Sequence, residues 1–286
     1  NDKNLYFAMY AETSTHLNIA GTPLSIKQTT DYPNDGMVKI SLDPEKPTTF
    51  TAHLRIPTWT GNQFVPGKLY KYVNQSNEDW SISVNGAKTK AKVVKGFATI
   101  KRTWKKGDQI VLDLPMPLQI NECDNRVEEN QNRLAFTRGP FVLCAEGIDN
   151  GGATQRFFLN RKKVAKKFKL ASVQLASGSF SQVKTKANAV DALGKEEDRS
   201  LSLIPYYAWN NRKPGSMTIW FPTTPKLAVF DPHKLPKKSV FSSIEASHTS
   251  ELDTASAVGD GKEPKWSSGK SVPRWTSRPQ LGKAQW

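Results

Sequence analysis

The chain has 286 residues, of which 37% are hydrophobic, and its 41 lysines and arginines outnumber 26 aspartates and glutamates to give a net charge of +15. This length allows one large domain or two, and no stretch approaches the roughly 18 apolar residues of a membrane-spanning helix. The basic balance is compatible with an acidic polysaccharide, with nucleic acid or with a solvated basic surface. Because the lysines are scattered and no nucleic-acid-binding motif accompanies them, we expect neither nucleic acid nor a membrane as a partner.

The first part of the chain alternates short apolar runs with turn residues. A short run over residues 5–10 precedes a hairpin predicted over residues 17–29, which turns at Gly21-Thr22-Pro23. Apolar and polar residues then alternate over residues 37–42 and 49–56. This alternation predicts strands that bury one face.

A tight hairpin is the clearest local signal in the sequence. Asn85-Gly86 supplies the two residues with positive φ that a type I′ turn needs. Residues 61–79 before it are predicted as a long loop, and strands are predicted over residues 80–84, 97–102 and 109–114. This order is typical of an antiparallel sandwich.

The second part of the chain continues with strands over residues 133–137, 141–145, 173–183 and 217–221. Residues 187–199 are polar and predicted as a loop. No helix longer than two or three turns is indicated anywhere. Many short strands separated by turn residues predict an all-β protein built from sandwiches.

Two other segments lack a clear pattern. Residues 162–168 are rich in lysine and predict either a short amphipathic helix or a basic loop. The wider basic run over residues 161–169 either forms a solvated face or grips a sulfated or uronic glycan. Residues 222–240 combine prolines and lysines with little periodicity, as in a linker.

Residues able to carry chemistry give no catalytic or metal-binding pattern. Cys123 and Cys144 are too few for a disulfide framework and predict two buried thiols or a single disulfide. The acids Glu128-Glu129 and Glu196-Glu197-Asp198 are neighbours in sequence and are expected in solvated polar loops, unlike a facing glycosidase pair. The histidines show no metal-ligand spacing; they are His16, His53, His233 and His248.

The aromatic residues allow two uses. Trp59, Trp80 and Trp104 lie at predicted strand ends, where packing is expected. Trp266 and Trp275 lie in a loop-rich tail, where stacking on a sugar ring is the alternative.

Several motifs in order and spacing resemble the region after the catalytic barrel in the family-127 glycoside hydrolases, the β-L-arabinofuranosidase family. The resemblance covers roughly residues 1–222. Its motifs are Thr29-Thr30-Asp31-Tyr32-Pro33 with Asp35-Gly36, Leu54-Arg55-Ile56-Pro57 with Trp59, Val84-Asn85-Gly86, Arg102 with Trp104 and Gly107-Asp108, Thr137-Arg138-Gly139-Pro140 with Cys144-Ala145-Glu146, and Ile204-Pro205-Tyr206-Tyr207-Ala208-Trp209-Asn210-Asn211-Arg212.

The resemblance implies that two β-sandwich domains follow an (α/α)₆ barrel and that the second interrupts the first. It places the chemistry in the barrel, where the family uses a glutamate acid/base and a zinc-bound cysteine nucleophile in a Cys₃Glu site. Cys123 and Cys144 do not match that cluster, so no catalytic residue is carried over and no cofactor is expected in this chain.

The last 46 residues resemble a different module, the start of a galactose-binding-like (discoidin-type) sandwich. Its signs are Ala246-Ser247-His248, Asp260-Gly261, Trp266 and Arg274-Trp275. Trp266, Arg274 and Trp275 are the candidate carbohydrate-binding residues.

The predicted architecture is therefore all-β, with two packed antiparallel, jelly-roll-like sandwiches and an incomplete third β module. We expect both ends of the protein to be cut. The predicted parts are an exit segment from a missing barrel (1–10), a first sandwich (11–120), an inserted second sandwich (121–205), a return strand to the first sandwich (206–222), a linker (223–240) and a truncated galactose-binding-like module (241–286).

Two functions remain open from the sequence. The first is a non-catalytic accessory fragment of a glycoside hydrolase, whose parent acts on plant or algal polysaccharide, with its own missing barrel as partner and a homo-oligomer possible. The alternative is a stand-alone protein that binds an anionic polysaccharide. From the resemblance alone we expect a bacterial periplasmic or extracellular location.

Overall fold

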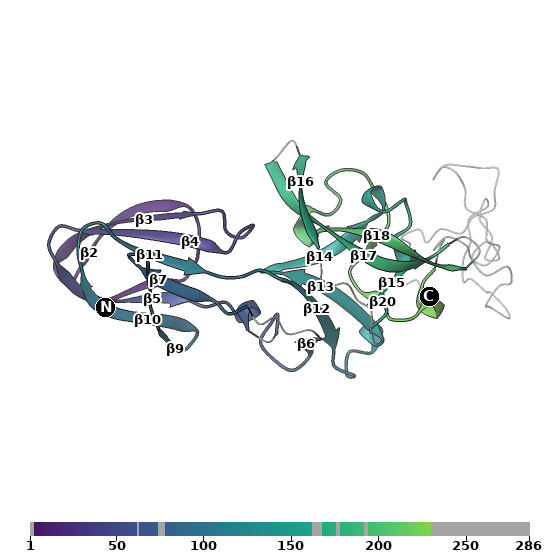
Figure 1. Cartoon of the computed structure of the whole chain (residues 1–286), viewed down its shortest axis with the longest axis horizontal. Coiled ribbons are helices and arrows are strands. Elements are labelled where there is room, and N and C mark those ends of the chain that lie inside the picture. Colours follow the sequence, from purple (N-terminus) through teal and green to yellow (C-terminus); the bar gives the residue numbers. More distant parts are fainter. Residues whose placement is uncertain are drawn as a thin grey trace, which may run out of the picture. The chain divides into compact units, whose positions relative to one another are not determined.

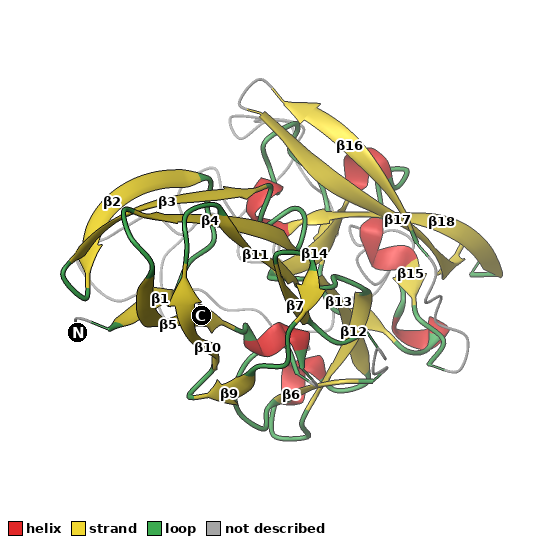
Figure 2. Ribbon diagram, turned by 60° about the vertical axis from the view of Figure 1, so that its left-hand side comes forward, coloured by secondary structure: helices red, strands yellow, loops and turns green. Residues whose placement is uncertain are grey.

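A computed structural model describes residues 3–61, 63–73, 78–161, 168–175, 178–191 and 194–229 (Figure 1). The described residues form strands joined by turns, and their helical elements are short 3₁₀ turns, drawn red in Figure 2. The fold class predicted from the sequence, all-β with antiparallel sheets, is confirmed. The predicted third module, the 241–286 tail, lies outside the described residues.

Two sheets face each other in the first sandwich. Their strand orders are β1-β5-β10-β9 and β2-β3-β4-β11-β7-β8. The strands are β1 (Asn4–Phe7), β2 (Thr13–Ile19), β3 (Thr22–Thr30), β4 (Met37–Pro44), β5 (Thr48–Arg55), β7 (Ser81–Val84), β8 (Ala87–Lys88), β9 (Lys92–Val94), β10 (Phe97–Trp104) and β11 (Asp108–Asp113).

The core of the first sandwich follows from the alternation seen in the sequence. On β5, Phe50, Ala52 and Leu54 are buried while the residues between them face outward. Trp104 is fully buried at the end of β10, and its indole N–H donates to the Phe50 carbonyl at 3.1 Å. The indole therefore fills the core without leaving its donor unpaired.

The turns of this sandwich match their sequence signals. Asn85 and Gly86 both have positive φ, 51° and 79°, as the predicted type I′ turn requires. Gly36 serves a different purpose, because a Cβ built on it would lie 1.8 Å from the Leu114 carbonyl oxygen. Leu114 N–H donates to the Gly36 carbonyl at 3.1 Å, so only glycine lets the two backbones approach this closely.

The second body, here called the C-terminal sheet, has the order β15-β17-β18-β14-β13-β12-β6, with β16, β19 and β20 paired at its sides. One buried cluster includes Ile120, Phe136, Leu203 and Phe221. The strands are β6 (Tyr70–Tyr72), β12 (Leu118–Cys123), β13 (Arg133–Arg138), β14 (Phe141–Glu146), β15 (Phe157–Phe158), β16 (Lys169–Leu175), β17 (Gly178–Val190), β18 (Glu196–Pro205), β19 (Met217–Thr218) and β20 (Phe221–Pro222).

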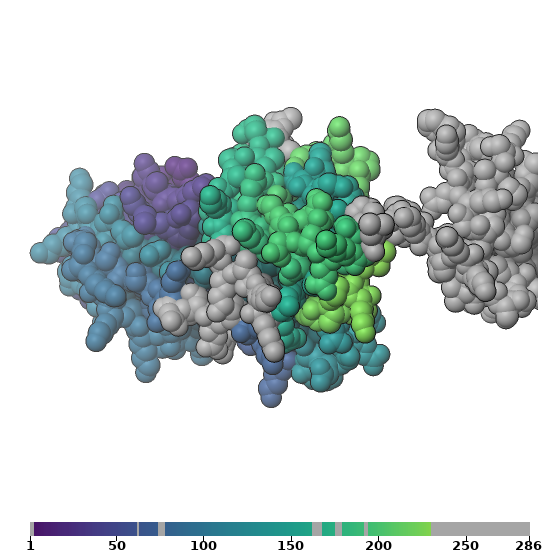
Figure 3. Space-filling view, turned by 45° about the vertical axis from the view of Figure 1, so that its right-hand side comes forward, coloured from purple at the N-terminus to yellow at the C-terminus, as the bar shows by residue number. Residues whose placement is uncertain are grey.

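A chain segment of the first sandwich contributes a strand to the C-terminal sheet, and polar contacts join the two bodies. β6 comes from the chain between β5 and β7 of the first sandwich, yet it pairs antiparallel with β12 of the C-terminal sheet. Nearby, Tyr72 donates its hydroxyl to the Trp59 carbonyl at 3.2 Å, and Arg138 donates to the Asn34 carbonyl at 3.1 Å. The parts coloured purple to blue and teal to green abut in Figure 3.

The structure differs from four sequence-based expectations. Residues 61–79, expected as a long loop, contain the strand β6. Residues 187–199, expected as a loop, belong largely to the paired strands β17 and β18. Residues 206–222, expected to return to the first sandwich, instead place β19 against β14 and β20 against β13. Residues 4–7, expected only as an exit segment, add a strand parallel to β5. Residues 187–190 and 196–199 pair with each other as a hairpin, whereas in the other cases backbone pairing with a partner distant in sequence decides the conformation.

The other boundaries in the domain prediction stay predictions. The described 3₁₀ turns are η1 (Thr58–Thr60), η2 (Glu128–Asn130), η3 (Gly147–Asp149), η4 (Thr154–Arg156), η5 (Tyr206–Ala208) and η6 (Pro225–Leu227). Within the described ranges no helix has the length and apolarity needed to cross a bilayer. The helix-or-loop segment at 162–168 falls almost wholly outside the described residues.

Candidate functional site

The acidic residues singled out in the sequence lie at the surface and do not face one another as a catalytic pair. Glu128 and Glu129 are exposed in η2. Glu197 lies on strand β18, in place of the expected loop, and forms ion pairs with Arg199 and, at 3.5 Å, with Arg156. Asp198, on the same strand, accepts from Asn188 at 2.7 Å. These contacts link strand β18 to its neighbours and do not form a facing pair of carboxyls.

The histidines and cysteines act singly in the described part of the chain. His16 is exposed, whereas His53 stacks on Tyr6 at 4.2 Å and bonds Asn4 at 2.8 Å, and burial lowers the pKa of His53. Cys144 is a buried free thiol whose pKa is raised to about 12, first by burial. Cys123 is a free thiol that is only partly buried.

Across the described ranges, no group of three or more His, Cys, Asp and Glu side chains could hold a metal ion. The zinc site implied by the family resemblance is expected in the barrel, and its Cys₃Glu ligand set has no counterpart among the described residues. His233 and His248 lie outside the described residues.

A largely buried ion cluster forms around Arg212, in the loop after η5. Its guanidinium donates to Asp149 at 2.9 and 2.6 Å and also contacts a carboxylate oxygen of Glu146. The side chains of Arg212, Glu146 and Asp149 are 14%, 4% and 16% exposed. The hydrogen bond with Asp149, helped by the bond with Glu146 and opposed by burial, raises the pKa of Arg212. Both acids are thus committed to holding a cation.

A set of exposed aromatic side chains, here called the aromatic platform, lies next to the ion cluster in sequence: Tyr206, Tyr207 and Trp209. The Asn210 N–H, directly after the platform, donates to Glu146 at 2.8 Å. Tyr206 and Trp209 stack with ring centroids 5.9 Å apart, and the platform residues are 44%, 59% and 38% exposed. Exposed, rigidly held aromatic rings are typical of a contact surface.

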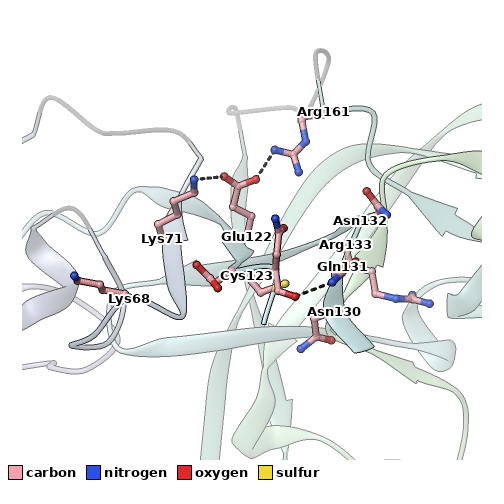
Figure 4. A pocket seen from close by; sticks show the side chains of 11 residues that line it. Lys68, Lys71, Glu122, Cys123, Asn130, Gln131, Asn132, Arg133 and Arg161 are labelled. Atoms are coloured by element: carbon pink, nitrogen blue, oxygen red, sulfur yellow. Dashed lines mark hydrogen bonds and ion pairs between the residues drawn. The ribbon is translucent and has the colours of Figure 1, made fainter. Parts of the chain in front are cut away.

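A polar pocket of about 370 Å³ opens at the end of β12 and β6 (Figure 4). Glu122 lies at its centre, with Lys71 at 3.1 Å on one side and Arg161 paired with it on the other. Burial alone raises the pKa of Glu122, but the hydrogen bonds from Arg161 and Lys71 outweigh burial and lower this pKa. The pocket is lined by Lys68, Lys71, Glu122, Cys123, Asp124, Asn125, Asn130, Gln131, Asn132, Arg133 and Arg161.

Sequence reasoning missed this pocket. Of its lining residues only Arg161 belongs to the basic run that was considered as a glycan contact, and most of that run lies outside the described residues. Lys71 and Glu122 face each other because β6 pairs with β12, which no local pattern indicates. The one available signal was the density of Asn and Gln between residues 125 and 132.

The aromatic residues considered for sugar contact divide clearly. Trp59 and Trp104 are buried and Trp80 packs against the same core, as expected for structural residues. The predicted carbohydrate-binding residues Trp266, Arg274 and Trp275 lie outside the described residues, so their role stays a prediction.

Two protein-family domains match nearly all of the residues that the structure describes. Residues 4–116 match the beta-L-arabinofuranosidase GH127 middle domain, and residues 118–222 match the glycoside hydrolase family 127 C-terminal domain. A non-reducing end beta-L-arabinofuranosidase of Bifidobacterium longum subsp. longum is 26% identical over 213 residues, which are 69% of this chain and 30% of that protein.

Solved structures give the same result. A GH127 beta-arabinofuranosidase superposes with a TM-score of 0.72 and 31% identity, over 80% of this chain and 36% of that one. A GH127 beta-L-arabinofuranosidase from Geobacillus stearothermophilus T6 gives a TM-score of 0.66 and 28% identity, over 78% and 34%. This chain therefore spans about a third of the length of these relatives.

Proposed function

Because the chain carries the middle and C-terminal domains of glycoside hydrolase family 127, we propose that it is the non-catalytic, accessory part of a glycoside hydrolase. The observation that carries this proposal is the consecutive match of both domains over residues 4–222, in relatives about three times as long. The catalytic domain of the parent would be a separate barrel, and any zinc would be bound there.

An exposed aromatic face of the first sandwich supports this role. On the outer side of β1, β5 and β10, Tyr6 is 57% exposed, stacks on His53 and meets Phe97 edge-on with ring centroids 5.4 Å apart. Val94 on β9 lies opposite Phe97 and is also exposed. Exposed aromatic and aliphatic side chains that lie together in this way are typical of a surface that another domain covers. We assign it to the catalytic barrel.

The names of the relatives support a reaction for the proposed parent. Their names describe removal of β-L-arabinofuranosyl groups, one of them from non-reducing ends. The parent would then hydrolyse the glycosidic bond of a terminal arabinofuranose in plant or algal glycans, outside the cytoplasm, with a homo-oligomer as its assembled form. The present chain would hold the barrel in place.

The first test is hydrolysis of 4-nitrophenyl β-L-arabinofuranoside. The purified chain should release no nitrophenol above the level of the heat-denatured protein, while the Geobacillus relative serves as positive control. Turnover by this chain alone would refute the non-catalytic role.

A second test addresses the contact face. The part of the Geobacillus relative outside the matched region, produced together with this chain, should co-purify with it. Tyr6→Asp should weaken this association, whereas Thr15→Asp, an exposed site on β2 of the other sheet, should not. Equal co-purification of both variants would remove the assigned face and leave the accessory role standing.

A further inference from the structure

We propose that the polar pocket binds an anionic sugar, meaning a sugar ring that carries a carboxylate or sulfate group. This inference deepens the proposed function, because it takes from it only that the ligand is a carbohydrate. The argument rests on the size, charge and hydrogen-bonding groups of the pocket.

The size of the pocket selects a small ligand. A volume of about 370 Å³ is at the lower end of the roughly 300–1,000 Å³ of ligand pockets, which fits one or two sugar rings. Its walls come from the ends of β6 and β12 and from the turn between β12 and β13. That turn is pinned where the Asn132 carbonyl accepts from Thr223 N–H at 2.8 Å. The site is therefore largely formed before a ligand arrives.

The charge of the pocket favours an anion. Four cationic side chains line it against two carboxylates. Glu122 is neutralised by Lys71 and Arg161, and Asp124 pairs with Arg126 at 2.6 Å. Lys68 and Arg133 are left without an acidic partner among the residues that the structure describes. Figure 4 shows these two side chains on opposite sides of the pocket, so a carboxylate or sulfate group would form charge-assisted hydrogen bonds with one of them.

The remaining groups suit hydroxyls. Asn125, Asn130, Gln131 and Asn132 each carry an amide that donates and accepts. A bare inorganic anion needs donors only, whereas each sugar hydroxyl needs both. The combination of unpaired cations with amides therefore selects a polyhydroxylated anion.

Glu122 orders the cationic side of the pocket. It holds Lys71 and Arg161 from opposite sides, as the dashed lines in Figure 4 show. Long cationic side chains lose conformational freedom when they bind a ligand. Here part of that ordering is already present, which leaves Lys68 as the exposed cation free to adjust to the ligand.

Isothermal titration calorimetry of the whole chain tests the proposal with four probes. They are digalacturonic acid, galactose 6-sulfate, neutral galactobiose and inorganic sulfate. We expect binding of one or both anionic sugars, no detectable binding of galactobiose, and weaker binding of inorganic sulfate. The two anionic probes distinguish a carboxylate from a sulfate ligand. Raising the salt concentration should weaken binding.

Variants locate the binding. Lys68→Gln should weaken it about three- to tenfold, since it removes one exposed charged donor. Arg133→Gln should weaken it further, although it also removes the 3.3 Å bond to the Trp220 carbonyl. Lys101→Gln, an exposed site on β10 of the first sandwich, is the matched control and should bind as the unchanged protein does.

Four results would overturn the inference: no binding of either anionic sugar, equal binding of galactobiose, sulfate binding as tightly as the sugars, or unchanged affinity in Lys68→Gln. None of them bears on the hydrolysis test, so this inference and the accessory role fail separately.

Discussion

Replacing Arg212 with methionine tests whether the buried ion cluster holds the end of the C-terminal sheet together. The substitution keeps an unbranched side chain but removes three hydrogen bonds, two to Asp149 and one to Glu146. Glu146 would remain 4% exposed, and the Asn210 N–H would be the remaining hydrogen-bond donor to its carboxylate among the described residues. Breaking a buried ion pair by removing one partner typically costs about 3–5 kcal/mol.

We expect the lower end of that range, about 3 kcal/mol of unfolding free energy, because Asp149 is partly exposed and the Arg212 Nε atom has no partner even in the unchanged protein. Urea unfolding followed by tryptophan fluorescence measures the loss. The control is the triple variant Arg212→Met, Glu146→Gln, Asp149→Asn, which removes the uncompensated charges and should recover much of it. A loss below about 1 kcal/mol, or a triple variant no more stable than the single one, would refute this reasoning.

Two further predictions concern the first sandwich. Gly36→Ala should lower the free energy of unfolding by about 3 kcal/mol or more, because its Cβ would lie 1.8 Å from the Leu114 carbonyl oxygen. Gly86→Ala meets no atom within 4 Å and should lower it by about 1–2 kcal/mol, from its positive φ alone. Similar losses for both variants in urea unfolding would contradict the close-approach argument. Burial alone raises the pKa of Asp108. Hydrogen bonds from the Asn85 side chain and the Lys105 N–H, together with the nearby charge of Arg102, outweigh burial and lower this pKa, so the ionised form of Asp108 stabilises the fold. Asp108→Asn should therefore cost about 1.5 kcal/mol at neutral pH, and the difference from the unchanged protein should shrink as pH falls below about 4; a gap that widens in acid would show the opposite sign.

The sequence predicted the elements whose side chains alternate between core and solvent. Residues 49–56 read directly as a strand because Phe50, Ala52 and Leu54 face one core. The same test missed the strand over residues 196–199, where Glu196, Asp198 and Arg199 are exposed. Here the ladder with β17 supplies the strand, and backbone pairing leaves no trace in hydrophobic periodicity.

The candidate site was predictable only in part. The motif that contains Arg212 was recognised, but its partners Glu146 and Asp149 lie 66 and 63 residues away. The pocket residues Lys71 and Glu122 meet through a strand in a segment predicted as a loop. Contacts that depend on long-range strand pairing cannot be predicted from residue type and local spacing, because an ordinary polar surface has the same residue types at the same spacing.

The position of strand β6 has a consequence for how the chain folds during synthesis. Residues 70–72 leave the ribosome long before β12, so their backbone N–H and C=O groups wait for a neighbour that is synthesised some fifty residues later. A protein that ends at residue 117, between the two matched family domains, would lack β12 and leave the backbone groups of residues 70–72 without their pairing partner, open to pairing with another chain. The boundary between the two matched domains is thus a poor place to divide the polypeptide for separate production.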